Sequence, residues 1–564
     1  MDFDTVIRNG RLFDGSGGPP VQADVGIRGE RITAVGKFEG RAAREIDASG
    51  QIVTPGFVDI HAHLDAQIFW DGLATSACWH GITSVIMGNC GVTFAPCREA
   101  DRGTLAHLME SVEDIPAKSI ELGMKWSWET FGEYLDALES QPLGINAGGM
   151  VGHSAVRFWV MGERALSQKT AGPDDVAAMR EVVGEAISKG ALGFSTSRTH
   201  VHRTPEGVEV PGTFADKNEL IGIARAMAEQ GGGVFQAIPY LDHSDAQTHR
   251  DELELMLDVG LETGLPVTFA YVHTRGMENG WREALEILDE GARRGAKVFG
   301  QTQVRSLGML FGLVNNTPWN TSGPSWADFT KLDLAGRLVL LKDPAARAQL
   351  VSEAEASRVS RGLMHLMYRQ RVEAGEARYD VRPEDSLMAL AAQRGVSGVE
   401  AFLQIAEQSE GQAIFLFPFG NHDFQVVGEM LRHPRMLLGL ADSGAHCGQI
   451  MDASLPSYLL SYWVRERGLM PLERAIEKLS SEPARFFGLE DRGVVREGAF
   501  ADLNIIDYER LQVLPPEFVH DLPGAAGRFI QKSRGITATL VNGSLFMQDG
   551  EHTGAFTGQV LRSN

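Results

Sequence analysis

The sequence predicts an α/β protein whose core is a closed barrel of eight parallel strands, because short apolar runs alternate with helical segments. Eight such runs occur in the middle of the chain: Gly56–Ile60, Ser84–Met87, Ile145–Val151, Ala191–Ser195, Gly233–Ile238, Pro266–Tyr271, Ala296–Gln301 and Leu437–Ala441. Between several of them lie segments of helical period that end at a glycine, such as Pro173–Lys189, Lys217–Gln230 and Trp281–Arg294. Alternating strands and helices favour a parallel sheet, and eight strands favour a (β/α)8 barrel; a doubly wound open sheet is the alternative.

Both ends of the chain are predicted to form β-structure. Thr5–Ile7 and Arg11–Phe13 flank Asn9-Gly10, a dipeptide that is typical of hairpin turns. Near the other end, Thr537–Val541 leads into a second such dipeptide, Asn542-Gly543. Two β-rich ends around a different middle predict one small composite β-domain.

The predicted domain organisation follows from this pattern. Residues 1–54 and 485–564 form the composite β-domain, a small β-sandwich, and residues 55–484 form the catalytic barrel. Two stretches interrupt the alternation, at about 97–143 and 303–430, and both carry helical patterns. Insertions of this kind belong on βα loops, at the face where barrel enzymes have their active sites.

The composition of the chain indicates which binding partners and which cellular compartment to expect. Lys and Arg total 52 against 74 Asp and Glu, a formal net charge of −22, which disfavours binding to nucleic acid or to an anionic membrane. No basic and apolar leader begins the chain, and no apolar run approaches the ~18 residues of a membrane span. The four cysteines form no CxxC pair and no disulfide framework, so we expect a cytoplasmic protein.

The first strand candidate runs directly into His61-Ala62-His63. Residues i and i+2 of a strand point to the same side, so two imidazoles would converge on one point at the strand end, as metal binding requires. Two polar loop histidines are the alternative interpretation.

The last strand candidate ends in Asp442, and small residues separate it from His446. An aspartate there could ligate a metal and take a proton from water, or it could form an Asx turn. His446 could orient a substrate or be a polar loop residue.

Five motifs in this order carry a resemblance to a known family: TPGFVDIHAH, GITSVIMGNCGV, GALGFSTS, GLADSGAH and DRGVVREGAFADL. The chain resembles the amidohydrolase superfamily, and within it the D-aminoacylase (N-acyl-D-amino-acid deacylase) branch, over nearly its whole length. The resemblance implies a distorted, TIM-like (β/α)8 barrel with metal at the strand ends. It implies His61, His63, Cys90 and Asp442 as metal ligands, with Asp442 also the catalytic proton acceptor.

The departures from that branch concern the second half of the metal site. Its characterised members carry a histidine after the fifth strand and another after the sixth, where this chain has Gln236 and Tyr271. His273 lies two residues further on the same face and, like Gln236, is a candidate metal ligand or neighbour of the ligands. The fourth strand ends in Ser195-Thr196-Ser197, with no lysine that could be carbamylated. We therefore expect one strongly bound zinc ion per chain rather than two equal ones.

Other polar side chains of the predicted βα loops are candidates for substrate binding. They are His153, Arg198, Arg305 and His446. An arginine could hold a substrate carboxylate through two parallel hydrogen bonds.

These observations predict a metal-dependent amidohydrolase that cleaves the C–N bond of a small N-acyl amino acid or related amide with metal-activated water. One alternative is a single-metal hydrolase of a lactone, carbamate or cyclic amide. The other is a catalytically degenerate barrel that serves as a binding or assembly protein. The oligomeric state stays open, and a homo-oligomer is compatible with the sequence.

Overall fold

The computed structural model describes residues 2–241 and 245–563, and it contains the predicted barrel. Eight parallel strands follow one another in chain order: β6 (Phe57–Asp59), β7 (Ile82–Met87), β8 (Asn146–Gly152), β9 (Gly193–Ser197), β10 (Val234–Ile238), β11 (Val267–Ala270), β12 (Val298–Thr302) and β18 (Met436–Leu438). Each lies within a few residues of a strand that the sequence predicts. The open-sheet alternative is wrong, because the segments that follow the first and last strands pair with each other.

The barrel closes between the segments that follow β6 and β18. The amide of Asp442 donates to the carbonyl of His61 over 3.0 Å, and the amide of His63 donates to the carbonyl of Ser443 over 2.8 Å. A parallel bridge between Ala62 and Ser443 lies between these two bonds. Closure therefore takes place at the carboxyl ends of the strands, through the residues that the sequence predicts to bind metal.

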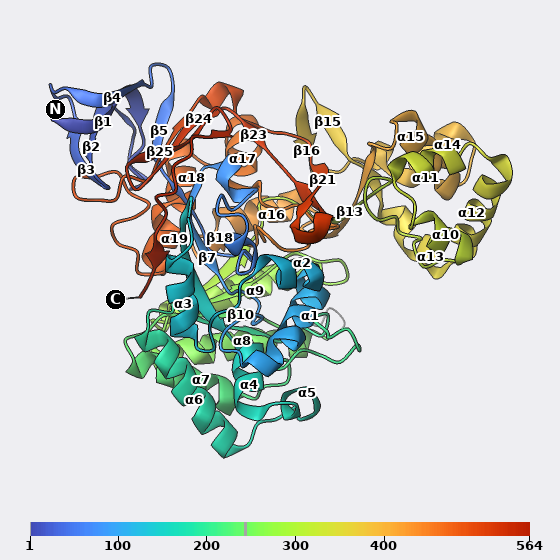
Figure 1. Cartoon of the computed structure of the whole chain (residues 1–564), viewed down its shortest axis with the longest axis horizontal. Helices are drawn as coiled ribbons and strands as arrows, with labels where there is room; N and C mark the ends of the chain where they lie inside the picture. Colours follow the sequence, from blue (N-terminus) through green and yellow to red (C-terminus); the bar gives the residue numbers. More distant parts are fainter. Residues whose placement is uncertain (1, 242–244, 564) are drawn as a thin grey trace.

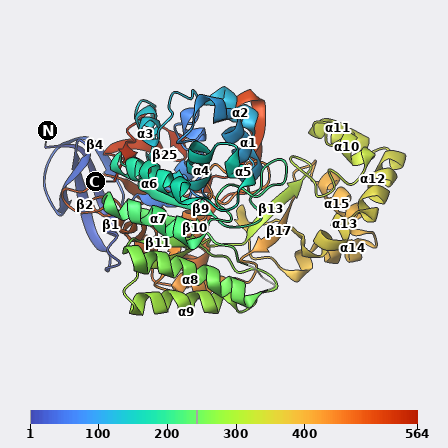
Figure 2. The ribbon, with the colours of Figure 1, turned by 90° about the horizontal axis from the view of Figure 1, so that it is seen from below.

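Helices cover the outside of the barrel, and they include α4 (His153–Met161), α6 (Pro173–Ser188), α7 (Lys217–Glu229), α8 (Ala246–Thr263), α9 (Gly280–Arg293), α16 (Phe424–Arg432), α18 (Leu472–Leu479) and α19 (Ser481–Phe486). Figure 2 shows α6, α7, α8 and α9 side by side. Helix α7 illustrates why they form: the Asp216 side chain caps it by accepting from the amide of Glu219. Its apolar stripe, which includes Leu220, Ile223 and Met227, is buried against the barrel side.

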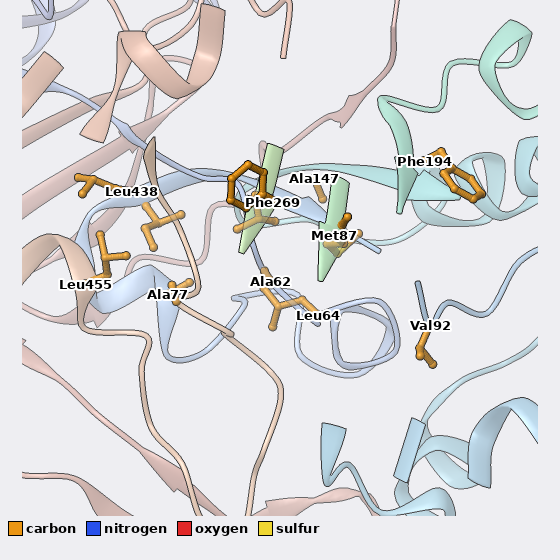
Figure 3. Packing of buried hydrophobic residues seen from close by; sticks show 14 of the residues in the cluster. Ala62, Leu64, Ala77, Met87, Val92, Ala147, Phe194, Phe269, Leu438 and Leu455 are labelled. Atoms are coloured by element: carbon orange, nitrogen blue, oxygen red, sulfur yellow. The ribbon is translucent and has the colours of Figure 1, made fainter. Parts of the chain in front are cut away.

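Apolar side chains from the barrel and its loops form one large buried cluster, part of which Figure 3 shows. Ala62 and Leu64 belong to it and are fully buried. They alternate along the chain with His61 and His63, so their packing holds the HxH segment in place. This anchoring gives the two imidazoles a rigid support.

Both chain ends build one nine-stranded sheet beside the barrel, near the N-terminus in Figure 1. Its strands are β1 (Phe3–Leu12), β2 (Val21–Arg28), β3 (Arg31–Gly36), β4 (Ala42–Asp47), β5 (Ile52–Pro55), β19 (Leu503–Ile506), β24 (Ile536–Val541), β25 (Ser544–Gln548) and β26 (Glu551–His552). The two halves join where β5 pairs antiparallel with β19. The domain limits given above stay a prediction, and their ends at Met1 and Asn564 lie outside the described residues.

Of the two predicted hairpin turns, one is wrong. Strand β1 continues through Asn9 and Gly10, with a register irregularity at that point. Asn9 adopts the left-handed conformation (φ 60°), and Gly10 leaves room for Val53, whose side chain would lie 2.4 Å from a Cβ. The turn at Asn542-Gly543 joins β24 to β25, as predicted, with positive φ at both residues.

The insertions are helical, as predicted, but the second also contains strands. The first holds α1 (Arg102–Glu113), α2 (Ala117–Gly123) and α3 (Phe131–Glu139). The second begins with β13 (Leu307–Gly312) and ends with β17 (Ile414–Gly420), which pair antiparallel. Helical period alone predicts neither of these two strands, because they pair across about a hundred residues of intervening chain.

Between β13 and β17 the chain forms a helical lobe that projects from the barrel (Figure 1). Its helices are α10 (Pro324–Phe329), α11 (Leu334–Leu340), α12 (Pro344–Ala356), α13 (Arg358–Leu363), α14 (Leu387–Arg394) and α15 (Gly398–Gln408). It has an apolar core of its own, built around Trp319, Trp326 and Phe402. Among the described residues, no helix combines the length and the hydropathy of a membrane span.

Candidate metal centre

Three of the predicted ligands come together at the carboxyl ends of β6 and β7. The Sγ of Cys90 lies 3.4 Å from Nε2 of His61 and 3.6 Å from Nε2 of His63. The three donor atoms all lie within 4.8 Å of one another, and the three side chains are buried. Alternation along the HxH segment aims both imidazoles at the cysteine, which the next strand delivers.

Asp442 adds a carboxylate from the other side of the barrel seam. Its Oδ1 lies 3.3 Å from Nε2 of His61 and 3.9 Å from Nε2 of His63. This oxygen is buried and has no hydrogen-bond donor within the described part of the chain. Two imidazoles, a thiol and a carboxyl are the donors that zinc prefers, so these residues fit a zinc ion.

The backbone is strained at this centre. Cys90 (φ 57°), Asp442 (φ 47°) and His446 (φ 52°) all adopt the left-handed conformation, which costs a non-glycine residue about 1–2 kcal/mol. Gly444 lies between the last two (φ 95°), and a Cβ there would lie 2.6 Å from the carbonyl oxygen of His63. Such strain gathers at functional sites, where the surrounding structure maintains it.

Burial sets the protonation of the donors. It lowers the pKa of His61 to about 4 and that of His63 well below 6.5, so both imidazoles are neutral and can donate electrons to a metal. Burial, then the carboxylates of Glu113 and Asp442, raise the pKa of the Cys90 thiol well above 9. Burial likewise raises the pKa of Asp442 well above 3.8. A divalent cation among these atoms would favour the thiolate and the carboxylate instead.

Gln236 on β10 reaches the edge of this cluster. Its side chain is fully buried, and its Oε1 accepts a hydrogen bond of 3.3 Å from the amide of Cys90. Its Nε2 has no hydrogen-bond acceptor among residues 2–241 and 245–563. The glutamine therefore supports the backbone at the cysteine.

The sixth-strand residues point to other neighbours. The hydroxyl of Tyr271 lies 3.3 Å from Nε2 of His249. The ring of His273 stacks on His422, with centroids 4.8 Å apart. In the described residues, His273 is not part of the group of donor atoms around Cys90. Its predicted role near the metal stays a prediction.

Three predicted substrate contacts are engaged by other protein groups. His153 is fully buried and contacts Thr196 (2.8 Å) and Glu219 (2.9 Å). Arg198 forms a two-pronged ion pair with Glu252, at 2.8 and 2.6 Å.

Arg305 is buried, pairs with Asp452 at 2.6 Å and lies over the ring of Tyr379. The structure thus gives His153, Arg198 and Arg305 interactions that support the loops. Substrate binding by any of them stays a prediction.

His446 lies beside the cluster, together with Glu113, which was not predicted from the sequence, and with Gln301 and His202, which end or follow predicted strands but were assigned no role. Glu113 is 3.5 Å from His446 and 3.6 Å from His63. Gln301 accepts at Oε1 from Nδ1 of His61 over 2.9 Å. His202 is held by Ser197 (2.9 Å), and its pKa falls to about 3 through burial and through the nearby His446 and His61.

A signal for Glu113 was present in the sequence. The apolar residues of α1 recur at Leu105, Leu108, Met109 and Val112, and Glu113 continues that stripe four residues after Met109. A carboxylate on the buried face of an amphipathic helix needs a partner.

A (β/α)8 barrel with a group of metal-binding donors at the carboxyl ends of its strands is the arrangement of a metal-dependent barrel enzyme. The sequence matches the amidohydrolase family over residues 44–546, and the chain belongs to that family. The family and the hydrolase class predicted from the sequence are confirmed.

The chain is similar to characterised members over its full length. It is 28% identical to D-aminoacylase of Alcaligenes xylosoxydans xylosoxydans, over 99% of this chain and 97% of that protein. It is also 28% identical to N-acyl-D-glutamate deacylase of the same organism, over 96% and 93% of the two chains. A D-aminoacylase structure described as defining a novel subset of amidohydrolases matches with a TM-score of 0.68 at 25% identity, over 100% of both chains.

Proposed function

We propose that this chain is a zinc-dependent deacylase that hydrolyses the amide bond of small N-acyl-D-amino acids. The observation that carries the proposal is the convergence of His61, His63, Cys90 and Asp442 within one barrel mouth. The relatives named D-aminoacylase and N-acyl-D-glutamate deacylase support the substrate class.

In this mechanism Asp442 is the residue that moves protons. Zinc, when bound, supplies an acidified water molecule and polarises the amide carbonyl. The Asp442 carboxylate accepts the proton of the attacking water and passes it to the leaving nitrogen. Gln236 and Gln301 hold the backbone of Cys90 and the ring of His61, so the donor atoms keep their places. His446 and His202 border the centre and would orient the substrate.

One strongly bound ion suits this donor set. A D-aminoacylase with a TM-score of 0.68 to this chain was described as having a binuclear centre with one-metal activation and second-metal attenuation. Here Gln236 stands where the branch has its fifth-strand histidine. An enzyme with a single zinc ion is therefore compatible with hydrolysis.

The compartment we propose is the cytoplasm. The four cysteines are all buried and unpaired, which suits a reducing environment. The formal net charge of −22 suits small substrates rather than nucleic acid.

The experiment compares the purified protein with the double variant His61→Ala, His63→Ala. We expect the unmodified chain to carry zinc and to release free amino acid from a panel of N-acyl-D-amino acids, with little release from the L-enantiomers. The double variant should lose both zinc and turnover. Normal zinc content and turnover in that variant would contradict the proposal. Turnover of lactones or cyclic amides alone would show that the enzyme hydrolyses a different class of bond.

A further inference from the structure

Glu113 is the last residue of α1, in the insertion between β7 and β8, and its side chain is 1% exposed. The helix ends there because Asp114 adopts the left-handed conformation (φ 53°). The carboxylate of Asp114 accepts from the amide of Gly448 over 3.0 Å. The end of α1 is thereby attached to the loop that follows β18.

The carboxylate of Glu113 lies between two imidazoles. Its Oε1 is 3.6 Å from Nδ1 of His63, and its Oε2 is 3.5 Å from Nε2 of His446. The amide of His446 also donates to the carbonyl of Glu113. Nδ1 of His63 is buried and has no hydrogen-bond partner within the described ranges. Glu113 is therefore the carboxylate placed to accept a hydrogen bond from this nitrogen.

His61 shows the same arrangement with a different partner. Its Nδ1 donates to Gln301, and its Nε2 faces Cys90. In His63 too, Nε2 faces Cys90, and Nδ1 faces Glu113. A metal-ligating histidine ordinarily donates its second ring proton to a carboxylate or carbonyl, which fixes the tautomer and the orientation of the ring.

We propose that Glu113 is a positioning residue that orients His63 towards the metal and fixes the loop of His446 against the same centre. The inference rests on the proposed function, because it needs a metal at His63. It also gives the first insertion a specific role, since α1 delivers a carboxylate that no barrel strand supplies.

The test is the zinc affinity of Glu113→Gln, measured by competition with a chelator on the full chain. Gln keeps the shape of the side chain and removes its charge. We expect affinity to fall by about 10- to 100-fold, as for other residues that orient metal ligands. The Co²⁺-substituted variant should also show a shifted d–d absorption band, which loss of packing elsewhere would not produce.

The matched control is Glu219→Gln. Glu219 is also 1% exposed and pairs with a buried histidine, His153, which lies outside the group of donor atoms. Its substitution should leave zinc affinity unchanged. Glu113→Asp, which keeps the charge, should retain more affinity than Glu113→Gln and serves if the Gln variant does not fold.

The outcomes separate the two proposals. An unmodified chain that binds no zinc contradicts the proposed function itself. An unmodified chain that binds zinc through His61 and His63, with a Glu113→Gln variant of equal affinity and an unchanged cobalt spectrum, overturns only the role of Glu113. An equal loss of affinity in Glu219→Gln overturns it as well.

Discussion

The amide of Asp442 donates to the carbonyl of His61 over 3.0 Å, so one of the hydrogen bonds that close the barrel also joins two candidate metal ligands. The carboxylate of Asp442 then lies 3.3 Å from Nε2 of the same histidine. Closure of the barrel and assembly of the centre are therefore one structural event. A substitution that disturbs the seam would disturb both.

Asp442→Asn should abolish most of the turnover while the fold survives. The amide keeps the shape of the carboxylate and lacks its basicity, so we expect a fall of about 10²- to 10⁴-fold in kcat. Circular dichroism would show that the variant is folded, and kcat would be expressed per bound zinc ion, because the substitution also changes a candidate ligand. Retained turnover would transfer the proton-accepting role elsewhere, with His446 as the next candidate.

Cys90→Ala should lower zinc occupancy and turnover, whereas Cys78→Ala should not. Both thiols are buried, but only that of Cys90 lies beside the HxH imidazoles. Loss of a thiolate ligand removes one of the strongest donors for zinc. The measurement is elemental analysis after gel filtration, and equal zinc content in the two variants would exclude Cys90 as a ligand.

The purified chain should hold about one zinc ion, because Gln236 is a weaker donor than imidazole. Gln236→His would place an imidazole beside Cys90 and should raise the occupancy of a second position. Gln236→Ala, which introduces no new donor, is the comparison and should not raise the occupancy of a second position. A crystal structure of the unmodified chain with two full ions and His273 coordinated would contradict this prediction.

His80 should make the protein less stable as the pH falls. It is fully buried between Ser457 (2.9 Å) and the carbonyl of Gln531 (3.2 Å), and burial lowers its pKa from 6.5 to about 3. Between these values the unfolded chain binds a proton that the native chain does not. The contribution of neutral His80 to the free energy of unfolding is thus complete above pH 6.5 and is lost as the pH falls towards 3.

His80→Asn removes this titration while it keeps a donor and an acceptor. The free energy of unfolding, measured in urea between pH 4 and 7, should depend less steeply on pH in the variant, by up to about 1.4 kcal/mol per pH unit. Identical slopes would show that His80 does not titrate as its burial indicates.

The eight strands were predictable because each is a local property of the chain. An apolar run of strand length that is bounded by glycine and followed by a helical pattern can be buried in few ways other than as a strand of a βα unit. The same holds for His61 and His63, since alternation along one strand decides their direction. The predicted turn at Asn9-Gly10 was wrong because it rested on the local sequence alone. Strand β1 continues through these two residues, since it pairs with β4 before them and with β5 after them.

Local patterns in the chain are enough to predict the barrel, the positions of His61 and His63 after one strand, and that of Asp442 after another. The ion pairs of Arg198 with Glu252 and of Arg305 with Asp452 could be seen only in the folded molecule. Folding also brings Glu113 from α1 to His63. Periodicity indicates only which side of a helix or strand a residue faces. Contacts between residues far apart in the sequence form only after the helices and strands have packed together.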